Sequence, residues 1–274
     1  MKANRKSRSN RAASPAISTV IVTAAMVALI TIALSFASNF LLLKMAESEF
    51  NSAKQFMQTL GLQIDDVAWV IGRTETIRYS SRYADVAFNL ALNYTVYVNT
   101  TTESNLKFYS NKTGIICFNM PVSRYSAGTS YYELIYPSEN NGFLLNGASA
   151  PTARIFGIEK LPMVDGSFAR VVVMPTIRML NLSLGDTNYV RLYLPILSEG
   201  EALRRSDSIT LTGESVSKTS ETVTGIRIEV SFPLDGFDNF FFKFPAVEES
   251  IVLDSDSILE LYTGGIDVAL GVHA

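Results

Sequence analysis

The sequence predicts an α+β protein in which one long N-terminal helix, able to cross a membrane, precedes an all-β, antiparallel, sandwich-like domain. Three observations predict this fold. The 31 residues from Ala13 to Leu43 include no charged residue. An apolar stripe then continues at helical spacing to Ile71, and from Thr74 onward the apolar pattern alternates with period two, which is typical of strands. We therefore expect a basic leader over 1–12, a helix over 13–72 and a β domain over 73–274.

The leader is basic and the segment after it is apolar. Residues 1–11 contain no acid and hold five cations, namely Lys2, Arg5, Lys6, Arg8 and Arg11. An apolar helix needs roughly 20 residues to cross a hydrocarbon core of about 30 Å. Because cationic flanks stay on the cytoplasmic side, everything after Lys44 is expected outside. The sequence predicts a location in the cell membrane and on the extracellular surface, with the N-terminus cytoplasmic before any processing.

Three interpretations of the leader remain open. A secretory signal would be cut after Ala37, where Ser35-Phe36-Ala37 has the small-x-small pattern, but its apolar segment is normally 7 to 15 residues long. The second interpretation is an uncleaved anchor. The third follows from a basic residue and a small residue, Arg11-Ala12, followed by Ala13-Ser14-Pro15 and a long Val/Ile/Ala/Leu helix.

This third pattern resembles the N-terminus of archaeal type IV pilin-like proteins, which carry a class III signal peptide. The resemblance covers about the first 35 residues, and it implies a cut between Ala12 and Ala13 by a prepilin peptidase. Bacterial type IV pilins usually carry a glutamate near the start of the mature helix, whereas Ile17 and its neighbours are uncharged here. The family's role implies a structural subunit of an archaeal surface filament used in adhesion or assembly, with the membrane and copies of itself or other pilin-like subunits as partners.

The composition of the apolar segment suits both insertion and later packing. Dragging an attached cation through hydrocarbon costs about 2.5 to 3.5 kcal/mol, so cutting off the leader removes a barrier to leaving the membrane. Small residues let helices approach closely. Pro15 fits the first helical turn, where Ser14 can cap. We expect helix packing to involve Ser14, Pro15, Ile17, Ala24, Ala25 and Ala28, although a plain anchor that is rich in alanine is the alternative.

The second half of the predicted helix is amphipathic. Its apolar positions follow Lys44 at spacings of three and four and form one stripe: Ala46, Phe50, Ala53, Met57, Leu60, Ile64, Val67 and Ile71. Charged residues such as Glu49 and Lys54 lie off the stripe and are expected to face water. Gly61 weakens the helix by about 1 kcal/mol relative to alanine, and Gly72 is a natural stop.

The remaining pattern is that of many short strands. The clearest is Val86 to Val98, and the others are expected at 106–110, 114–120, 131–136, 153–158, 168–174, 177–182, 189–196, 208–211, 222–231, 240–244, 251–253, 258–262 and 266–270. Turn chemistry such as Asp165-Gly166 and Gly264-Gly265 separates them. The Ser/Thr-rich stretch from Thr212 to Thr224 is expected to be a long hairpin loop. Short strands with little helical patterning indicate an antiparallel sandwich or barrel.

Reactive residue types are scarce, so we expect no catalytic site, no cofactor and no metal. The chain has one cysteine, Cys117 in an apolar run, and one histidine, His273. After Arg11 there are 18 basic and 26 acidic residues, a balance of −8 that argues against nucleic acid. Asp254-Ser-Asp256 and Asp235-Gly-Phe-Asp238 could supply calcium ligands, but they lack the spacing of an EF-hand and are expected to form turns.

Two further features concern the surface. In a strand, the run from Phe240 to Phe244 would place three rings on one face, either as core or as an aromatic contact surface. Four N-x-S/T sequons make N-glycosylation a hypothesis at Asn93, Asn99, Asn111 and Asn181. The leading interpretation is a non-enzymatic filament subunit. The alternative is a single-pass membrane-anchored surface protein with a ligand-binding β domain, and an extracellular hydrolase that uses a carboxylate pair is a third.

Overall fold

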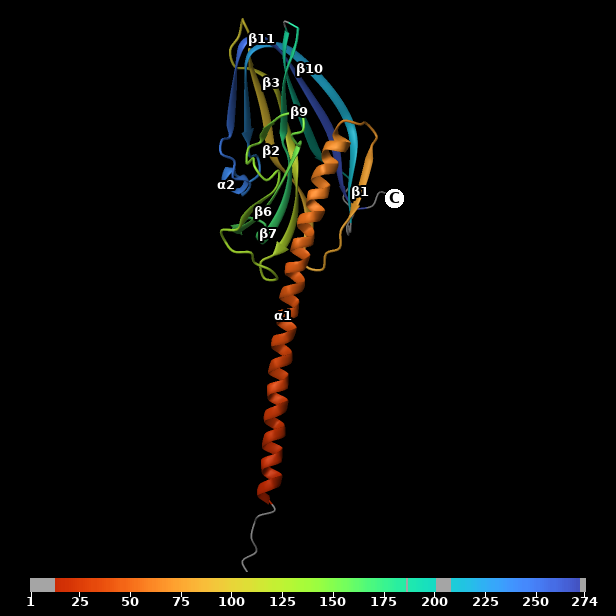
Figure 1. Ribbon diagram of the computed structural model, residues 1–274, viewed down its shortest axis with the longest axis vertical. Coiled ribbons are helices and arrows are strands. Elements are labelled where there is room, and N and C mark those ends of the chain that lie inside the picture. Colours follow the sequence, from red (N-terminus) through yellow and green to blue (C-terminus); the bar gives the residue numbers. More distant parts are fainter. Residues whose placement is uncertain (1–12, 186, 201–207, 272–274) are drawn as a thin grey trace, which may run out of the picture. The chain divides into compact units, whose positions relative to one another are not determined.

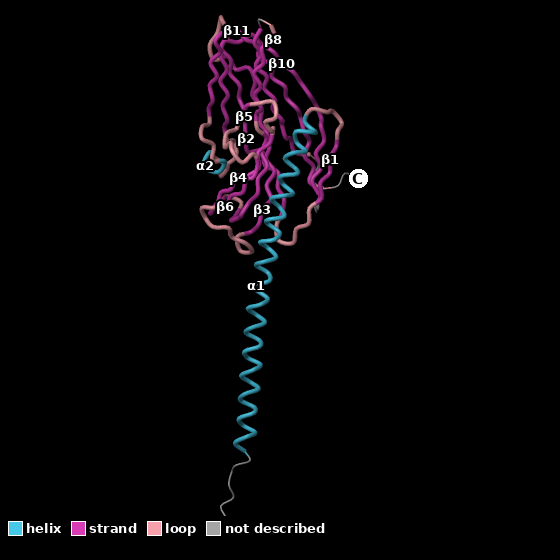
Figure 2. Tube along the Cα trace, in the orientation of Figure 1, coloured by secondary structure: helices cyan, strands magenta, loops and turns pink. Residues whose placement is uncertain are grey.

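The computed structural model describes residues 13–185, 187–200 and 208–271 (Figure 1). Strands make up most of the chain after the first helix (Figure 2). The elements in order are α1 (Ala13–Ala68), β1 (Thr74–Arg78), β2 (Asp85–Asn99), β3 (Leu106–Pro121), β4 (Tyr132–Tyr136), β5 (Leu144–Asn146), β6 (Ala153–Met163), β7 (Gly166–Pro175), β8 (Ile177–Leu184), β9 (Thr187–Glu199), β10 (Ser208–Ser231), α2 (Asn239–Phe242) and β11 (Glu248–Leu270). A long helix followed by a β-rich domain is the α+β class expected from the sequence.

The chain divides into two compact units, Met1–Glu47 and Ser48–Ala274. Helix α1 begins in the first unit and ends in the second. It ends at Ala68, four residues before the predicted stop at Gly72. Ile71, the last position of the predicted stripe, therefore lies outside the helix and is 66% exposed, whereas the stripe residues from Phe50 to Val67 are buried.

The eleven strands form one sheet in the order β4-β6-β7-β3-β2-β10-β11-β9-β8-β5, with β1 paired to β10. Most neighbours are antiparallel, as expected. Two pairs are parallel, β9 with β11 and β5 with β8, and there the antiparallel expectation is wrong. The reason for the first pair is topological. Strand β11 lies between β9 and β10, which run in opposite directions, so it must be parallel to one of them.

The sheet curves until strands far apart in its order meet. The backbone N–H of Leu197 on β9 donates to Thr113 Oγ1 on β3 at 2.9 Å, although three strands separate β9 from β3 in the sheet. Nearer in the order, with only β3 between the two strands, the side chain of Tyr94 on β2 donates to the carbonyl oxygen of Pro175 at the end of β7, at 2.8 Å. The curved sheet therefore encloses one hydrophobic core, which we call the inner cluster.

A second core lies on the other face of the sheet, where the end of α1 packs. On β3 the two faces alternate residue by residue: Cys117 belongs to the inner cluster, and Ile116 and Phe118 belong to the helix-side cluster. The helix contributes its stripe to the helix-side cluster through residues 50–68. Strands buried on both faces explain why the runs in β3, β6 and β7 are continuously apolar rather than alternating.

Two strand glycines let the helix end approach the sheet. A Cβ built on Gly264 of β11 would lie 2.2 Å from the carbonyl oxygen of Ala68, and one on Gly213 of β10 would lie 2.4 Å from that of Val70. Gly213 also exchanges backbone hydrogen bonds with the segment after the helix, accepting from Gly72 N–H at 2.7 Å and donating to Arg73 O at 2.9 Å. The prediction of a turn at Gly264-Gly265 is therefore wrong: both glycines lie inside β11, where Gly264 provides room for the helix end.

Several expected loops are strands. The stretch from Thr212 to Thr224 lies inside β10 and pairs with β11 over residues 215–223 and 257–265, so the hairpin-loop prediction is wrong. The two strands predicted at 106–110 and 114–120 are parts of a single strand, β3. The three strands predicted between 251 and 270 are likewise parts of one strand, β11. Strand β5 was not predicted. Serine and threonine suit these positions because cross-strand hydroxyl pairs form there, as between Ser217 and Thr263 at 2.6 Å.

Glu260 joins three neighbouring strands and gives stability a pH dependence. On β11, its carboxylate accepts from Lys218 of β10 at 2.5 Å and from Arg191 of β9 at 2.6 Å. These hydrogen bonds, with that from Lys218 the stronger influence, hold the pKa of Glu260 below its usual value, although burial opposes them. A carboxyl group whose folded-state pKa is depressed stabilises the protein above its unfolded-state pKa of about 4.3, and that contribution is lost as pH falls through the folded-state pKa.

We therefore expect thermal stability to fall more steeply between pH 5 and pH 3 in the wild-type protein than in Glu260→Gln. Differential scanning measurements across this range test it. Glu221→Gln, which changes an exposed carboxylate on β10, is the matched control and should keep the wild-type slope. Equal slopes for the wild type and Glu260→Gln would contradict the assignment.

Candidate functional site

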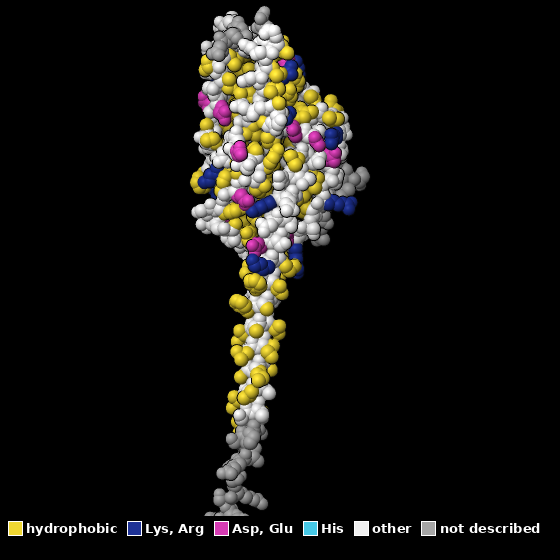
Figure 3. Space-filling view, viewed as in Figure 1, with side chains coloured by type: hydrophobic (Ala, Val, Ile, Leu, Met, Phe, Trp, Pro, Cys, Tyr) yellow, Lys and Arg dark blue, Asp and Glu magenta, His cyan; other side chains and the backbone are white. Residues whose placement is uncertain are grey.

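The helix from Ile17 to Met45 exposes apolar side chains on every side. Large hydrophobic residues with exposed side chains are Ile17, Val20, Ile21, Val22, Met26, Val27, Leu29, Ile30, Ile32, Leu34, Phe36, Phe40, Leu41, Leu42, Leu43 and Met45. Side chains of this kind, drawn in yellow, cover this part of the helix in the space-filling view (Figure 3). The helix is long and apolar enough to cross a membrane. Exposed apolar surface of this extent requires lipid or another apolar surface against it.

The few hydroxyl groups in this segment also suit an apolar environment. Thr23 donates its hydroxyl to the carbonyl oxygen of Thr19 at 2.9 Å, and Thr31 donates to that of Val27 at 2.8 Å. A hydroxyl bonded to its own helix needs no water. The side-chain hydroxyls of Thr23 and Thr31 therefore add little to the free-energy cost of placing the helix in hydrocarbon.

The predicted packing residues lie on this helix, and part of the predicted processing junction does not fall in the described residues. Ala24, Ala25 and Ala28 are exposed, and Ala24 and Ala28 lie one turn apart on one face. Ser14 and Pro15 belong to the first turn of α1. Ala13 is the first residue of α1, whereas Arg11 and Ala12 lie outside the described residues, so the junction stays a prediction.

Two acidic residues in the second half of α1, Asp65 and Glu49, accept hydrogen bonds from residues of the β domain. Asp65 accepts from Trp69 Nε1 at 3.0 Å, from Thr152 Oγ1 at 2.9 Å and from Arg178 Nη1 at 3.3 Å. Glu49 Oε1 accepts from the Ser81 hydroxyl at 2.5 Å and from the backbone N–H groups of residues 82–84 at 3.1 to 3.3 Å. Sequence spacing predicts that Glu49 lies off the apolar stripe and can face water; it lies off the stripe but is only half-exposed, because the β1–β2 connection folds around its carboxylate.

Lys54 also differs from its prediction. Its ammonium lies 2.5 Å from Glu133 Oε2 on β4. The hydrogen bonds from Lys54 and from the Tyr131 hydroxyl hold the pKa of Glu133 below its usual value, although burial opposes them. Lys54, which lies beside the apolar stripe of α1, therefore contacts the β domain through an ion pair.

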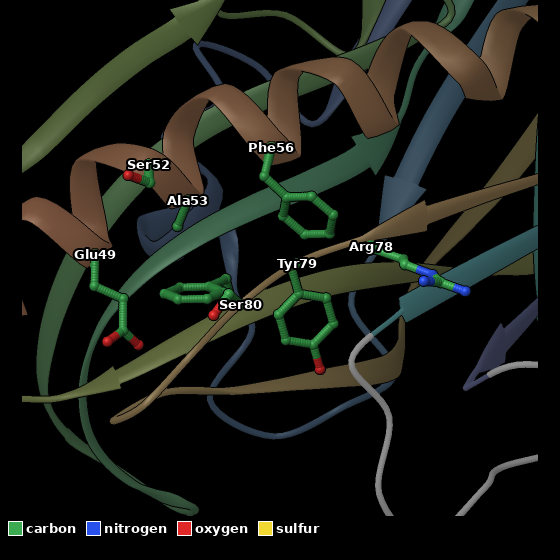
Figure 4. A pocket seen from close by; sticks show the side chains of 8 residues that line it. Glu49, Ser52, Ala53, Phe56, Arg78, Tyr79 and Ser80 are labelled. Carbon is green, nitrogen blue, oxygen red and sulfur yellow. The ribbon is translucent and has the colours of Figure 1, made fainter.

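A pocket of about 300 Å³ opens between α1 and the segment after β1. The rings of Phe56 and Tyr79 both line this pocket and contact each other, with centroids 5.2 Å apart (Figure 4). Glu49, Arg78 and Phe118 of β3 also line it. Because Glu49 Oε1 already accepts four hydrogen bonds, this pocket is mainly an aromatic recess.

The run from Phe240 to Phe244 is not a strand, so that prediction is wrong. Asp238 caps a single turn, α2, by accepting from the Phe241 N–H at 2.8 Å, and Lys243 ends it with a φ of 55°. Phe241, Phe242 and Phe244 are buried in the inner cluster, whereas Phe240 is 63% exposed. The core interpretation of this run therefore holds for three rings, and the fourth ring lies at the surface.

Arg154 on β6 contacts this turn from the buried side and hydrogen-bonds its backbone. Its side chain is fully buried and donates to the carbonyl oxygens of Asn141 at 2.6 Å and Phe242 at 3.3 Å, and to the hydroxyl of Tyr132. The rings of Phe156 and Phe244 flank the guanidinium. Among the described residues no carboxylate lies within 4 Å of it. Burial lowers the pKa of Arg154, yet an arginine stays charged at neutral pH.

Replacing Arg154 with methionine is expected to lower the free energy of unfolding by about 3 kcal/mol, because the buried carbonyl oxygen of Phe242 and the partly buried carbonyl oxygen of Asn141 lose their donor. Methionine keeps most of the side-chain volume, so the loss reports mainly on hydrogen bonding. Urea denaturation followed by circular dichroism measures it. The control Arg78→Met, at an exposed arginine on β1, should change stability by less than about 0.5 kcal/mol. A loss under 1 kcal/mol in Arg154→Met would contradict the structural role.

The four sequons lie on strands rather than in loops. Asn99, Asn111 and Asn181 are exposed and Asn93 is half-buried. Asn99 Oδ1 accepts from the Asn105 N–H at 2.8 Å, and Asn93 Nδ2 donates to the Ser231 hydroxyl at 3.2 Å. Glycosylation at these positions stays a prediction, which intact-mass measurement of the native protein tests.

The described residues contain no cluster of three or more His, Cys, Asp or Glu that could hold a metal. Asp238 serves as a helix cap, and the side chains of Asp254 and Asp256 lie outside the described part, as does His273. Cys117 is buried, and burial raises the pKa of its thiol to about 12, which agrees with an inert thiol.

In comparisons with known proteins, no family model, no curated protein and no solved structure matches the chain.

Proposed function

We propose that this protein is a structural, non-enzymatic subunit of an archaeal type IV pilus-like surface filament. The observation that carries the proposal is the apolar surface of α1 from Ile17 to Met45, exposed on every side. A helix of this kind needs lipid before assembly and the helices of other subunits after it. The same surface serves both stages in turn.

The sequence of events follows from charge and hydrophobicity. The helix inserts with its basic leader in the cytoplasm, and the β domain lies on the extracellular side. A prepilin peptidase then cuts between Ala12 and Ala13, which removes the five leader cations. Freed of these charges, the helix leaves the membrane and packs against copies of itself or against other pilin-like subunits through its small residues.

The test compares filaments built from the wild-type protein and from a double variant, Ala24→Leu with Ala28→Leu. Added side-chain volume on this face should separate packed helices while leaving the segment apolar. We expect membrane insertion to persist and filaments to disappear in electron micrographs. Ile21→Leu, a volume-conserving change on the same helix, is the control and should keep its filaments. Filaments unaffected by the double variant would contradict packing through Ala24 and Ala28.

The second candidate is a single-pass membrane-anchored surface protein whose β domain binds a ligand. It is favoured by the pocket beside α2, described below, because an anchored receptor needs a recess of that kind. Electron microscopy separates the two functions. Cells that make the wild-type chain without helix-cored filaments containing it would support the anchored receptor and contradict the filament subunit.

A further inference from the structure

A second pocket of about 300 Å³ lies on the β domain between the segment before β4, strand β6 and α2. Its lining combines hydroxyl, cationic and aromatic side chains, principally Thr129, Ser130, Tyr131, Lys160, Phe240 and Lys243. The volume is at the lower end of the range for small-molecule sites, so it suits one terminal unit of a larger molecule.

Two lysines lie beside one exposed ring at the mouth of this pocket. Lys243 Nζ is 3.6 Å from the centroid of the Phe240 ring and Lys160 Nζ is 5.6 Å from it. Dark-blue cationic atoms adjoin yellow apolar atoms at the position where Figure 1 labels α2 (Figure 3). Attraction of ammonium groups to the ring holds the two charges near each other before any ligand arrives.

The local charge balance is positive. Lys160 pairs with Asp238 at 3.2 Å, whereas Lys243 forms no ion pair among the described residues. Glu159 also lines the pocket, but its oxygens accept from the Ser126 hydroxyl at 2.8 Å and from the N–H groups of Ala127 and Gly128 at 2.7 and 3.0 Å.

The buried guanidinium of Arg154, which donates to the carbonyl oxygen of Phe242 in α2, adds a third positive charge behind this turn. The lining of the pocket itself holds two ammonium groups and one carboxylate, that of Glu159, which already accepts from three donors. The pocket favours an anion over a cation.

The rest of α2 is built to hold this arrangement rigidly. Phe241 and Phe242 are buried in the inner cluster, and Asp238 caps the turn. Lys243 adopts a positive φ of 55°, which non-glycine residues seldom do, and its N–H donates to Asn239 O at 2.9 Å. Unusual backbone conformations of this kind cluster at ligand sites.

We propose that this pocket binds the carboxylate-bearing unit of an acidic saccharide. The carboxylate accepts from the ammonium groups of Lys243 and Lys160, and sugar hydroxyls bond to the side chains of Thr129 and Ser130. The C–H face of the sugar lies against Phe240 and Leu161. This assignment goes beyond filament assembly and does not depend on it, since every lining residue belongs to the β domain.

The experiment titrates the full-length protein in detergent with trigalacturonate by calorimetry, using fully methyl-esterified trigalacturonate as the uncharged probe. We expect saturable binding of the acid and at least about tenfold weaker binding of the ester, since a charge-assisted hydrogen bond is lost. Lys243→Gln and Lys160→Gln should each raise the Kd about tenfold with unchanged melting temperatures. Lys112→Gln removes an exposed charge on β3 and should leave the Kd unchanged.

Four outcomes would overturn the proposal. They are no binding of trigalacturonate at millimolar concentration, equal binding of the methyl ester, an effect of Lys112→Gln as large as that of Lys243→Gln, and displacement of the saccharide by an equal concentration of inorganic phosphate. The last would make the pocket a general anion site. Loss of filaments in the helix variants changes none of these results, so the two proposals fail separately.

Discussion

Replacing Gly264 with valine is expected to lower the free energy of unfolding by about 3 kcal/mol, the upper end of what overpacking costs. A Cβ at this position would lie 2.2 Å from the carbonyl oxygen of Ala68, which is a backbone atom of the helix and cannot rotate away as a side chain could. The helix end would have to move off β11, which would pull Val67 out of the helix-side cluster. The backbone hydrogen bonds that Gly213 makes with Gly72 and Arg73 would be strained as well.

Thermal and urea denaturation of the Gly264→Val protein in detergent measure this effect. Thr263→Val is the matched control, because it places the same side chain on the neighbouring position of β11, where the hydrogen bonds of the hydroxyl with Ser217 and with Tyr109 are lost. The control should cost less than about 1 kcal/mol. A Gly264→Val protein as stable as this control would show that the helix end does not need the glycine.

A chain that begins at Lys44 is expected to move completely from the membrane fraction to the soluble fraction. Both hydrophobic clusters of the β domain are formed by residues from Phe50 onward, so the truncated chain keeps its cores. What it loses is the exposed apolar surface from Ile17 to Leu43. It should unfold cooperatively, since its unit of structure has its own internal packing.

Ultracentrifugation of lysates from cells that make either chain measures this partition. The full-length protein should sediment with membranes and return to solution only with detergent. A truncated chain that still sediments with membranes, while showing the circular dichroism of a folded β protein, would mean that the β domain itself binds membrane. The apolar segment would then not be the membrane-binding element.

The sequence predicted best the elements whose one face is buried. The 4-3-4-3 spacing from Phe50 to Val67 predicted a buried helical stripe, and strict alternation from Val86 to Val98 predicted β2, because each pattern has a single period. The position of the helix end was less predictable. It depends on Gly213 and Gly264, which lie more than 140 residues further along the chain.

Elements without a single apolar face were predicted poorly. From Glu214 to Thr222, β10 is exposed and pairs with β11 on one side, so its serines and threonines carry no period-two signal. The glycines of β11 resembled a turn because a sequence does not distinguish flexibility from close approach. At Phe240, alternating rings indicated a strand, but the cap at Asp238 and burial in the inner cluster favoured one helical turn.

The two candidate sites also differ in how far they could be predicted from the sequence. The apolar helix surface is a local property of the chain and was predictable from composition alone. The pocket beside α2 joins Thr129, Lys160 and Lys243, which come from three distant segments, so no local pattern reveals it. One signal was present in the sequence: Asp238, a preferred N-cap residue, lies two positions before Phe240 and could have indicated a capped turn.

The most direct test of the central claim is the N-terminus of the native protein, determined by N-terminal sequencing and intact-mass measurement of protein isolated from its own cells. A filament subunit processed by a prepilin peptidase begins at Ala13. A protein that retains Met1, or one that begins at Ser38 after cleavage as a secretory signal, would contradict the proposal that α1 is released from its basic leader to pack with its neighbours.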